Sequence, residues 1–300
     1  MQIQLVPYLL LIGFGSLVCI FWFYFTDRKT CSAGNSFRLS LLILFLGSLL
    51  GLGCARVFWV LFRCFMHPAF FVLRAEELSY YGGVAGVALA VCLAAKCCGR
   101  KPGTVLNTFA PAGAFLAAIF RFAEGFLGML GFGRYLDNGI FFPVTVELYD
   151  EFFSEYYLAV FMLEGLLSLG AMVFSLMHRT EKDCFLRTLF YLCLPQILCE
   201  SLRIQSIRWL FIRTEQLICY LFCEIILIGY AVRHKPNRFL SWIPALAGLG
   251  ICGFIVAIEY ALDGKITVGG KAIPHLLLYG IMALLLVGMA VAEHKGRSRK

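Results

Sequence analysis

Nine long apolar runs dominate this sequence of 300 residues. A helix needs roughly 20 mostly apolar residues to cross a lipid bilayer. Runs of about that length lie at 6–26, 38–62, 80–98, 105–121, 156–177, 186–202, 216–232, 239–262 and 273–293. The chain is 61% hydrophobic and 15% charged, and its mean hydropathy is +0.83. These proportions exclude a soluble globular protein. They predict an all-α fold, a polytopic membrane bundle of about nine transmembrane helices.

Basic residues alternate between the two sides of this predicted bundle. The odd-numbered loops and the C-terminal tail hold most of the Lys and Arg residues, all on one side of a nine-span arrangement. Because cytoplasmic loops are enriched in Lys and Arg, the pattern predicts an N-terminus outside the cytoplasm and a C-terminus inside it. The basic residues of this side are Arg28, Lys29, Arg38, Lys96, Arg100, Lys101, Arg179, Lys182, Arg187, Arg233, Lys235, Arg238, Lys295, Arg297, Arg299 and Lys300.

The remaining basic residues fall within the membrane or on the opposite side, and all but two of them are arginines. They are Arg56, Arg63, Arg74, Arg121, Arg134, Arg203, Arg208, Arg213, Lys265 and Lys271. Arginine presents a planar fork that pairs with a phosphate at two points, whereas lysine is a point charge. Loops outside the cytoplasm have no topological reason to collect arginine, so a phosphate-bearing ligand is one explanation.

Charged residues also interrupt the apolar runs, where a central charge costs about 2.5–3.5 kcal/mol. Arg121 and Glu124 are three residues apart, as are Glu200 and Arg203, so each pair shares a helix face if its helix continues. Structural ion pairs are one interpretation, and we favour a functional site. Glycines follow Glu124 closely in "RFAEGFLGMLGFGRY" and indicate that the chain turns tightly there.

The third run begins with the stretch "YYGGVAGVALA", which contains Tyr81, Gly82 and Gly83. Small residues at this spacing allow helices to approach closely. A glycine pair at a helix entrance also exposes backbone N–H groups to an anion. The 13 cysteines form no CxxC pair, and no metal-ligand spacing is present. We therefore expect neither a metal nor another cofactor.

Six stretches resemble the prolipoprotein diacylglyceryl transferase family over roughly residues 45–232. "GCARVFWVLF" is similar to the family's Gly-Ala-Arg-Leu, and "LSYYGGVAGV" to its Ser-Phe-His-Gly-Gly. "RFAEGFLGMLGFGR" resembles the signature Gly-Arg-x-Gly-Asn-Phe-x-Asn-Gly-Glu-x-x-Gly-Arg. "MLEGLLSL" resembles Leu-Leu-Glu-Gly, and "ILCESLR" with "RTEQL" resembles Glu-Phe-Phe-Arg followed by Gly-Gln. The matched positions are Arg56, Ser79, Gly82, Gly83, Arg121, Gly128, Gly133, Arg134, Glu164, Glu200, Arg203 and Gln216.

The resemblance implies transfer of a diacylglyceryl group from phosphatidylglycerol to the lipobox cysteine thiol of a prolipoprotein. It implies a bacterial cytoplasmic membrane, a phosphatidylglycerol-like phospholipid and a prolipoprotein signal peptide as partners, and no nucleic acid. Residues 1–232 would form the family core, and residues 233–300 two additional helices with a basic tail. The implied catalytic residues are Arg121, Glu124, Tyr81 and Glu200. The implied substrate-binding residues are Arg56, Gly82, Gly83, Arg134, Glu164, Arg203 and Gln216.

Four departures from the family keep other functions open. The family's histidine is Tyr81 here, its signature asparagine is Glu124, its signature glutamate is Met129 and its late arginine is Gln196. A tyrosine with a pKa of ~10 is a poor base at neutral pH unless a nearby cation lowers that pKa, and Glu124 is the alternative base. The alternative is a non-catalytic homologue that binds phospholipid or lipoprotein.

A small transporter or channel is a third interpretation. It rests on three glutamates inside apolar runs, which are Glu164, Glu224 and Glu259. Many transporters are built from two similar halves with matched sites. The charges of this chain are not matched between two halves, which argues against this function.

Overall fold

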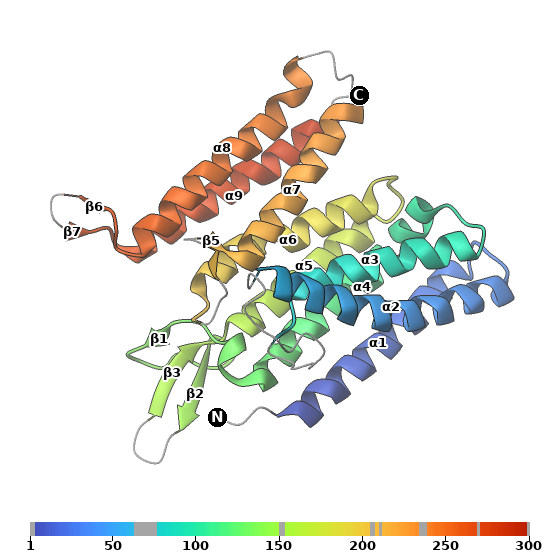
Figure 1. Ribbon diagram of the computed structural model, residues 1–300, viewed down its shortest axis with the longest axis horizontal. Helices are drawn as coiled ribbons and strands as arrows, with labels where there is room; N and C mark the ends of the chain where they lie inside the picture. Colours follow the sequence, from blue (N-terminus) through green and yellow to red (C-terminus); the bar gives the residue numbers. More distant parts are fainter. Residues whose placement is uncertain are drawn as a thin grey trace. The chain divides into compact units, whose positions relative to one another are not determined.

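A computed structural model describes residues 4–62, 77–149, 154–204, 208–209, 212–233, 239–268 and 271–298. Within these residues nine α-helices are long and apolar enough to cross a membrane (Figure 1). They are α1 (Leu5–Asp27), α2 (Ala33–Phe62), α3 (Tyr80–Cys97), α4 (Pro102–Glu124), α5 (Val160–Met177), α6 (Cys184–Leu202), α7 (Thr214–Arg233), α8 (Phe239–Leu262) and α9 (His275–Ser298). The predicted multi-pass helical bundle is confirmed at this level.

The bounds of α4 and α5 differ from the sequence prediction for identifiable reasons. α4 begins at Pro102, because proline is favoured in the first turn, where its missing N–H is not needed. It continues through Arg121 to Glu124, so both charges lie on one helix. α5 begins at Val160, not at residue 156, because residues 154–158 pair as a strand.

A small sheet between α4 and α5 was missing from the prediction. β1 (Tyr135–Leu136), β3 (Ser154–Leu158) and β2 (Thr145–Tyr149) are antiparallel in that order, with Thr145 opposite Leu158. A 3₁₀ segment, η2 (Gly125–Gly131), joins α4 to this sheet. Two pairs of short strands lie elsewhere: β4 (Arg208–Trp209) with β5 (Ile212–Arg213), and β6 (Thr267–Val268) with β7 (Lys271–Ala272). A search for apolar runs long enough to span a bilayer does not detect elements this short.

The chain divides into two compact units. Unit 1 comprises Met1–Leu192 and Leu202–Ile207, and unit 2 comprises Cys193–Ser201 and Arg208–Lys300. Unit 1 therefore contains α1–α5 with the first half of α6. Unit 2 contains α7–α9 with most of the second half of α6. The boundary predicted after residue 232 stays a prediction. It was drawn where the family resemblance ends, whereas the two units are defined by contacts within the structure.

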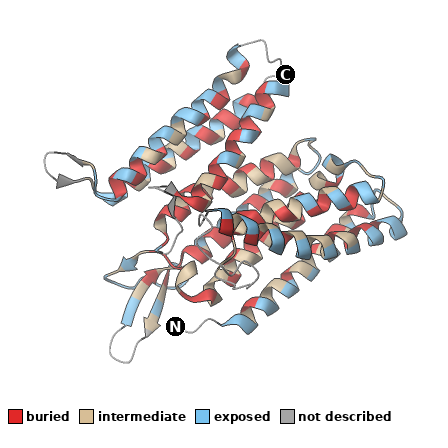
Figure 2. Cartoon of the chain, in the orientation of Figure 1, coloured by how far each residue is buried: buried red, intermediate tan, exposed pale blue. Residues whose placement is uncertain are grey.

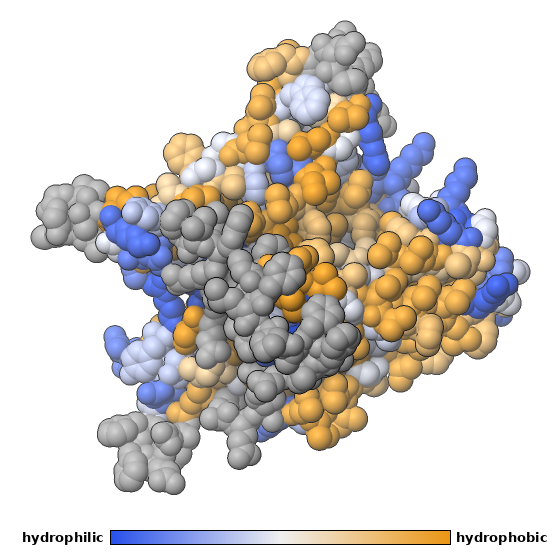
Figure 3. All heavy atoms as spheres, in the orientation of Figure 1, coloured by the Kyte–Doolittle hydropathy of each residue, from blue (hydrophilic) through white to orange (hydrophobic). Residues whose placement is uncertain are grey.

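Glycines set the distance between α2 and α3 in unit 1. A Cβ at Gly82 would lie 2.9 Å from the Cys54 carbonyl oxygen, and one at Gly86 would collide with the Leu50 carbonyl. Only residues without a side chain permit such close helix contact. The outer faces of these helices carry large exposed apolar side chains, as lipid-facing helices do. Figure 2 shows the exposed faces, and Figure 3 shows the broad hydrophobic surface over unit 1.

A buried ion pair joins the end of α1 to the α3–α4 loop. Asp27 is fully buried and accepts hydrogen bonds from Arg100 Nη1 at 2.8 and 2.7 Å and from the Ser36 hydroxyl at 2.8 Å. The hydrogen bond to Asp27 raises the pKa of Arg100. This pair therefore ties α1 to the connection between α3 and α4.

Candidate functional site

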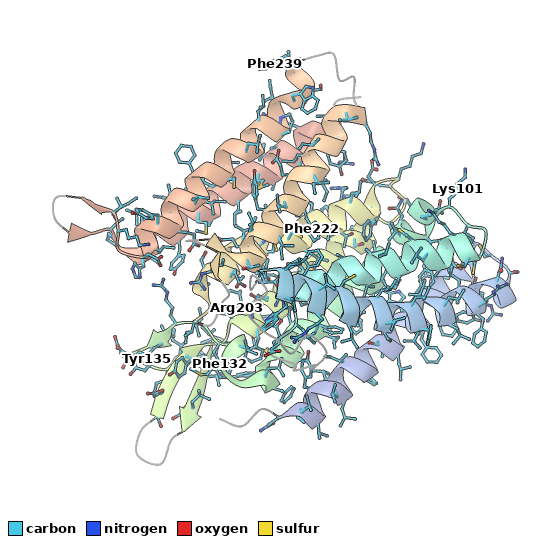
Figure 4. The ribbon with its side chains drawn as sticks, viewed as in Figure 1. Lys101, Phe132, Tyr135, Arg203, Phe222 and Phe239 are labelled. Atoms are coloured by element: carbon cyan, nitrogen blue, oxygen red, sulfur yellow. The ribbon has the colours of Figure 1, made fainter. Side chains whose placement is uncertain are left out.

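Four charged side chains of unit 1 meet where α4 gives way to the sheet. Arg121 lies in the last turn of α4 and Glu124 ends that helix. Glu164 lies one turn into α5, and Arg203 directly follows α6. Figure 4 places Arg203 near Phe132 and Tyr135 at this end of the unit, with Lys101 at the other end. We call these four charged residues the charge ring.

Each member of the charge ring contacts two members of opposite charge. Arg121 Nη1 lies 2.5 Å from Glu124 Oε1, and Arg121 Nε lies 3.3 Å from Glu164 Oε2. Arg203 Nε donates to Glu164 Oε1 at 3.0 Å, and Arg203 Nη2 contacts both Glu164 and Glu124. The ion pairs therefore close into a loop of two cations and two anions.

Burial makes this charge balance necessary. Arg121 and Glu164 are each 2% exposed, and Arg203 is 8% exposed. An isolated charge in this environment is strongly disfavoured, whereas paired and hydrogen-bonded charges are tolerated. Glu124 is the most accessible member, with 14% of its side chain exposed. It is therefore the carboxylate of the ring that a second molecule can most readily approach.

One guanidinium nitrogen of Arg121 does not take part in the ion pairs of the charge ring. This atom, Nη2, is buried and makes no hydrogen bond among the residues that the structure describes. The Tyr80 ring lies 3.5 Å below the guanidinium carbon and fixes the plane of the fork. The Tyr80 hydroxyl donates to the Ala117 carbonyl at 3.0 Å, which holds the ring in place. A buried arginine donor without an acceptor is a candidate contact for an anionic ligand.

Glycines after α4 return the chain to the charge ring. Gly128 has a φ of +70°, a conformation that residues with a side chain rarely adopt. A Cβ at Gly131 would lie 3.0 Å from the Glu124 carbonyl oxygen, so the 3₁₀ segment folds back closely onto the end of α4. This return brings the Leu130 carbonyl to Arg203 Nη1, which donates to it at 2.9 Å. The turn indicated by the glycines is present at Gly128.

A pocket of about 730 Å³ lies beside the charge ring within unit 1. Its walls come from α1, α4, η2, α5 and the sheet region, and they are mostly aromatic and aliphatic. We call it the aromatic pocket. The lining residues are Leu11, Phe122, Gly125, Phe126, Phe132, Ile140, Phe142, Thr145, Val146, Glu147, Tyr156, Phe161 and Met162. Phe122 and Gly125 directly follow ring members along the chain. The ring residues themselves do not line the pocket. The ring and the pocket are neighbours because both take residues from α4 and α5.

One polar contact lies on the pocket wall. The Tyr156 hydroxyl donates to Glu147 Oε1 at 3.3 Å, and the negative charge of Glu147 raises the pKa of Tyr156. The phenol therefore stays neutral at physiological pH. Such a pocket, apolar with a few polar groups, is typical of sites for apolar ligands.

Tyr81 and the glycine pair take up structural contacts at the start of α3. Tyr81 is 2% exposed, its hydroxyl donates to the Leu192 carbonyl at 3.1 Å, and its ring lies 5.7 Å from the Arg121 guanidinium. The Gly82 and Gly83 amides donate to the side chain and the carbonyl of Ser79, both at 3.1 Å. These two amides are occupied by the helix cap, and Gly82 also provides the close contact with α2.

Two further candidate arginines lie outside the charge ring. Arg56 forms its own ion pair with Glu77 at 2.7 Å and stacks 4.8 Å from the Trp59 ring. The Arg134 backbone joins the sheet to the end of α6, since its amide donates to the Leu202 carbonyl at 3.1 Å. Arg63 and Arg74 lie outside the described residues.

Glu200 and Gln216 belong to unit 2, where they lie in polar contacts of that unit. Glu200 accepts a hydrogen bond from Gln196 at 3.4 Å. Gln216 belongs to a group of polar residues around Glu259, a buried carboxylate on α8. We call this group the Glu259 cluster. Gln216 Nε2 donates to Glu259 Oε1 at 3.0 Å, and the Ser201 hydroxyl donates to the same oxygen. The cavity beside this cluster measures about 20 Å³, enough for roughly one water.

Sequence reasoning missed several partners in these networks. Glu77 is the counter-ion of Arg56, although the two are 21 residues apart in the chain. Ser201 and Arg213 join Glu259, with Arg213 Nε 4.0 Å from Glu259 Oε2. An acidic residue just before the third apolar run is a signal that could have identified Glu77 as the partner of a buried arginine. The contact between Ser201 and Glu259 joins α6 to α8 and has no local signal.

No family model matches this chain, and no curated protein matches it. The described residues contain no cluster of three or more His, Cys, Asp or Glu that could hold a metal ion. The molecule is thus placed by its own features, as a polytopic helical membrane protein with a buried ion-pair ring beside an aromatic pocket.

Proposed function

We propose that this protein transfers a diacylglyceryl group from phosphatidylglycerol to the lipobox cysteine thiol of a prolipoprotein. One observation carries the proposal: four residues drawn from three separate motifs form one charge ring beside a pocket of about 730 Å³. We place the ring on the outer side of a bacterial cytoplasmic membrane, with the N-terminus outside, following the distribution of basic residues.

The charge ring supplies the groups that this reaction needs. Arg121 Nη2 would donate to a phosphate oxygen of the lipid and stabilise the leaving glycerol phosphate. The thiolate sulfur would attack the glycerol carbon, forming the C–S bond as the C–O bond to phosphate breaks. Glu124, the most accessible carboxylate of the ring, would take the thiol proton, since the thiolate is the nucleophile. The aromatic pocket would hold an acyl chain of the donor.

A direct transfer assay tests this function. The purified chain in phosphatidylglycerol nanodiscs would receive a lipobox peptide, and mass spectrometry would look for the diacylglyceryl thioether and free glycerol phosphate. We expect product with the wild type and at least 100-fold less with Arg121→Gln or Glu124→Gln.

Arg187→Gln is the matched control in that assay. Arg187 is 3% exposed, pairs with Glu181 at 2.7 Å and stacks 4.6 Å from the Phe174 ring, so it copies the setting of Arg121 outside the charge ring. We expect this variant to keep its product yield. No wild-type product in vitro, together with no rescue of a strain depleted of its own transferase, would refute the proposed reaction.

A non-catalytic phospholipid-binding protein is the second candidate, favoured by a specific observation. Both oxygens of Glu124 contact arginines, and the Tyr81 hydroxyl is bound to a backbone carbonyl. Each candidate base is therefore already engaged. This function predicts that phosphatidylglycerol binds to the wild type and weakens in Arg121→Gln while no thioether forms. Any transferred diacylglycerol would exclude it.

A further inference from the structure

An exposed apolar turn lies between β1 and β2, outside the helices. Phe141 is 72% exposed, Phe142 is 66% exposed and Ile140 is 55% exposed. Three consecutive large apolar residues at this exposure form a patch, whereas single exposed apolar residues are common on any surface. A patch of this kind requires an apolar partner.

The turn holds these side chains in a defined arrangement. The Val144 amide donates to the Phe141 carbonyl at 3.0 Å, and the Thr145 hydroxyl donates to the Ile140 carbonyl. The Tyr156 ring packs so closely against Gly139 that a Cβ there would collide with it. Backbone and side-chain hydrogen bonds therefore fix the turn and direct its apolar residues outward.

The turn also lies at the level where a membrane-spanning helix begins. The Ala159 amide donates to the Val144 carbonyl at 2.9 Å, and Ala159 immediately precedes the first residue of α5. Ile140 and Phe142 line the aromatic pocket together with Leu11 and Phe122, which belong to the spanning helices α1 and α4. The patch is thus continuous with side chains at membrane depth.

We propose that Ile140, Phe141 and Phe142 insert into the membrane–water interface at this end of unit 1 and contact lipid there. Aromatic side chains are favoured at this depth, and insertion removes the exposed apolar surface from water. Exposed Asp137 and Asn138 precede the turn and remain at head-group level. Because two of the inserting residues also line the aromatic pocket, lipid would border the pocket at this rim. Contact with lipid does not depend on whether the proposed transfer occurs.

Site-specific photocrosslinking tests this contact. Phe141 would be replaced by benzoylphenylalanine, and the full chain would be irradiated in nanodiscs of phosphatidylethanolamine and phosphatidylglycerol. The control carries the same group at Ser154, an exposed residue of β3. Ser154 is four residues before Leu158, roughly 13 Å further along the strand from α5. Mass spectrometry would count phospholipid adducts.

We expect at least ten-fold more phospholipid adduct at position 141 than at position 154. Equal yields at the two positions would overturn the proposal, because they would indicate random encounters with lipid. Adducts at position 141 with a second copy of the chain, in place of lipid, would overturn it as well. An independent measurement is quenching of a tryptophan at position 141 by brominated lipid. At least two-fold stronger quenching than at position 154 supports the contact, and equal quenching contradicts it.

Discussion

The charge ring of unit 1 and the Glu259 cluster of unit 2 are both buried polar networks among apolar helices, and they are built differently. The ring joins two arginines to two glutamates by direct ion pairs. In the cluster, the carboxylate of Glu259 accepts hydrogen bonds from uncharged Ser201 and Gln216, and Arg213 lies 4.0 Å away. The ring adjoins a pocket of about 730 Å³, and the cluster a cavity of about 20 Å³.

We propose that this difference in neighbouring space separates a ligand-binding site from a polar cluster that holds helices together. The Glu259 cluster takes residues from α6, α7 and α8, and the Tyr279 hydroxyl of α9 donates to the Ser201 carbonyl at 3.4 Å. It connects all the helices of its unit and leaves room for little more than a water. Each network keeps at least one buried polar atom without a hydrogen-bond partner among the described residues, Arg121 Nη2 in the ring and Gln216 Oε1 in the cluster, but only the ring adjoins a large pocket. We therefore propose ligand binding for the ring and helix association for the cluster.

The largest effect is expected when the ring loses an anion. Glu164→Ala leaves two buried arginines to share Glu124, and breaking a buried ion pair costs about 3–5 kcal/mol. The free energy of unfolding in detergent micelles, measured by urea titration, would show this loss. The Glu164→Ala/Arg203→Ala double variant restores the charge balance, so it should lose less than the sum of the two single variants. Additive losses would argue against a coupled ring.

A smaller loss is expected from Glu259→Gln in the other network. Glutamine keeps an acceptor for Ser201 and Gln216 but removes the charge near Arg213. Hydrogen bonds to charged groups contribute about 1.5–3 kcal/mol, so we expect about 2 kcal/mol of destabilisation by the same titration. Phosphatidylglycerol binding by the folded protein should be unchanged. A loss of lipid binding equal to that of a ring variant would remove the distinction between the two regions.

A third variant tests whether the glycines of α3 serve packing. Gly86→Ala places a methyl group against the Leu50 carbonyl and 2.9 Å from Gly51 Cα. Separating two packed helices typically costs about 1–3 kcal/mol, and thermal unfolding should shift to lower temperature. Gly47→Ala on α2 is the control, because no described atom lies within 4 Å of its Cβ position. An unchanged transition for Gly86→Ala would show that α2 and α3 do not pack this closely.

The smallest effect concerns the ion pair at the other end of unit 1. Asp27→Asn weakens the hydrogen bonds from Arg100, which is partly exposed, so we expect about 1 kcal/mol of destabilisation. The pKa of Arg100 is raised in the folded state, so its contribution is fully present below the pKa of the unfolded chain and is lost only in strong alkali. Unfolding midpoints should show the same difference between variant and wild type at pH 6 and pH 9. A difference that changes within that range would point to another titrating group.

Much of the fold was predictable because membrane helices have a strong local signal. All nine apolar runs correspond to helices, since length and hydrophobicity alone determine whether a segment can span. The three-stranded sheet was missed because β2 and β3 are short and depend on pairing with one another. The start of α5 was misplaced for the same reason, because the strand residues Tyr156 and Tyr157 continue the apolar run.

The site was predictable only in part. The pairing of Arg121 with Glu124 follows from their spacing once α4 is known to continue. The contacts of Glu164 with Arg121 and Arg203 join α5 to α4 and to the residue that follows α6, which are distant in the sequence, and no local pattern specifies them. The expectation that Gly82 and Gly83 offer free amides did not anticipate that Ser79 caps them.

We propose that the charge ring holds a phospholipid through Arg121, and native mass spectrometry of the protein released from phosphatidylglycerol nanodiscs measures this binding. We predict one retained phosphatidylglycerol on the wild type, on Arg187→Gln and on Glu259→Gln. We predict at least ten-fold lower occupancy on Arg121→Gln and on Arg121→Lys, whose ammonium lacks the second edge of the fork. Thermal unfolding would establish that each variant is folded. Equal retention by the folded Arg121 variants and the wild type would contradict the account.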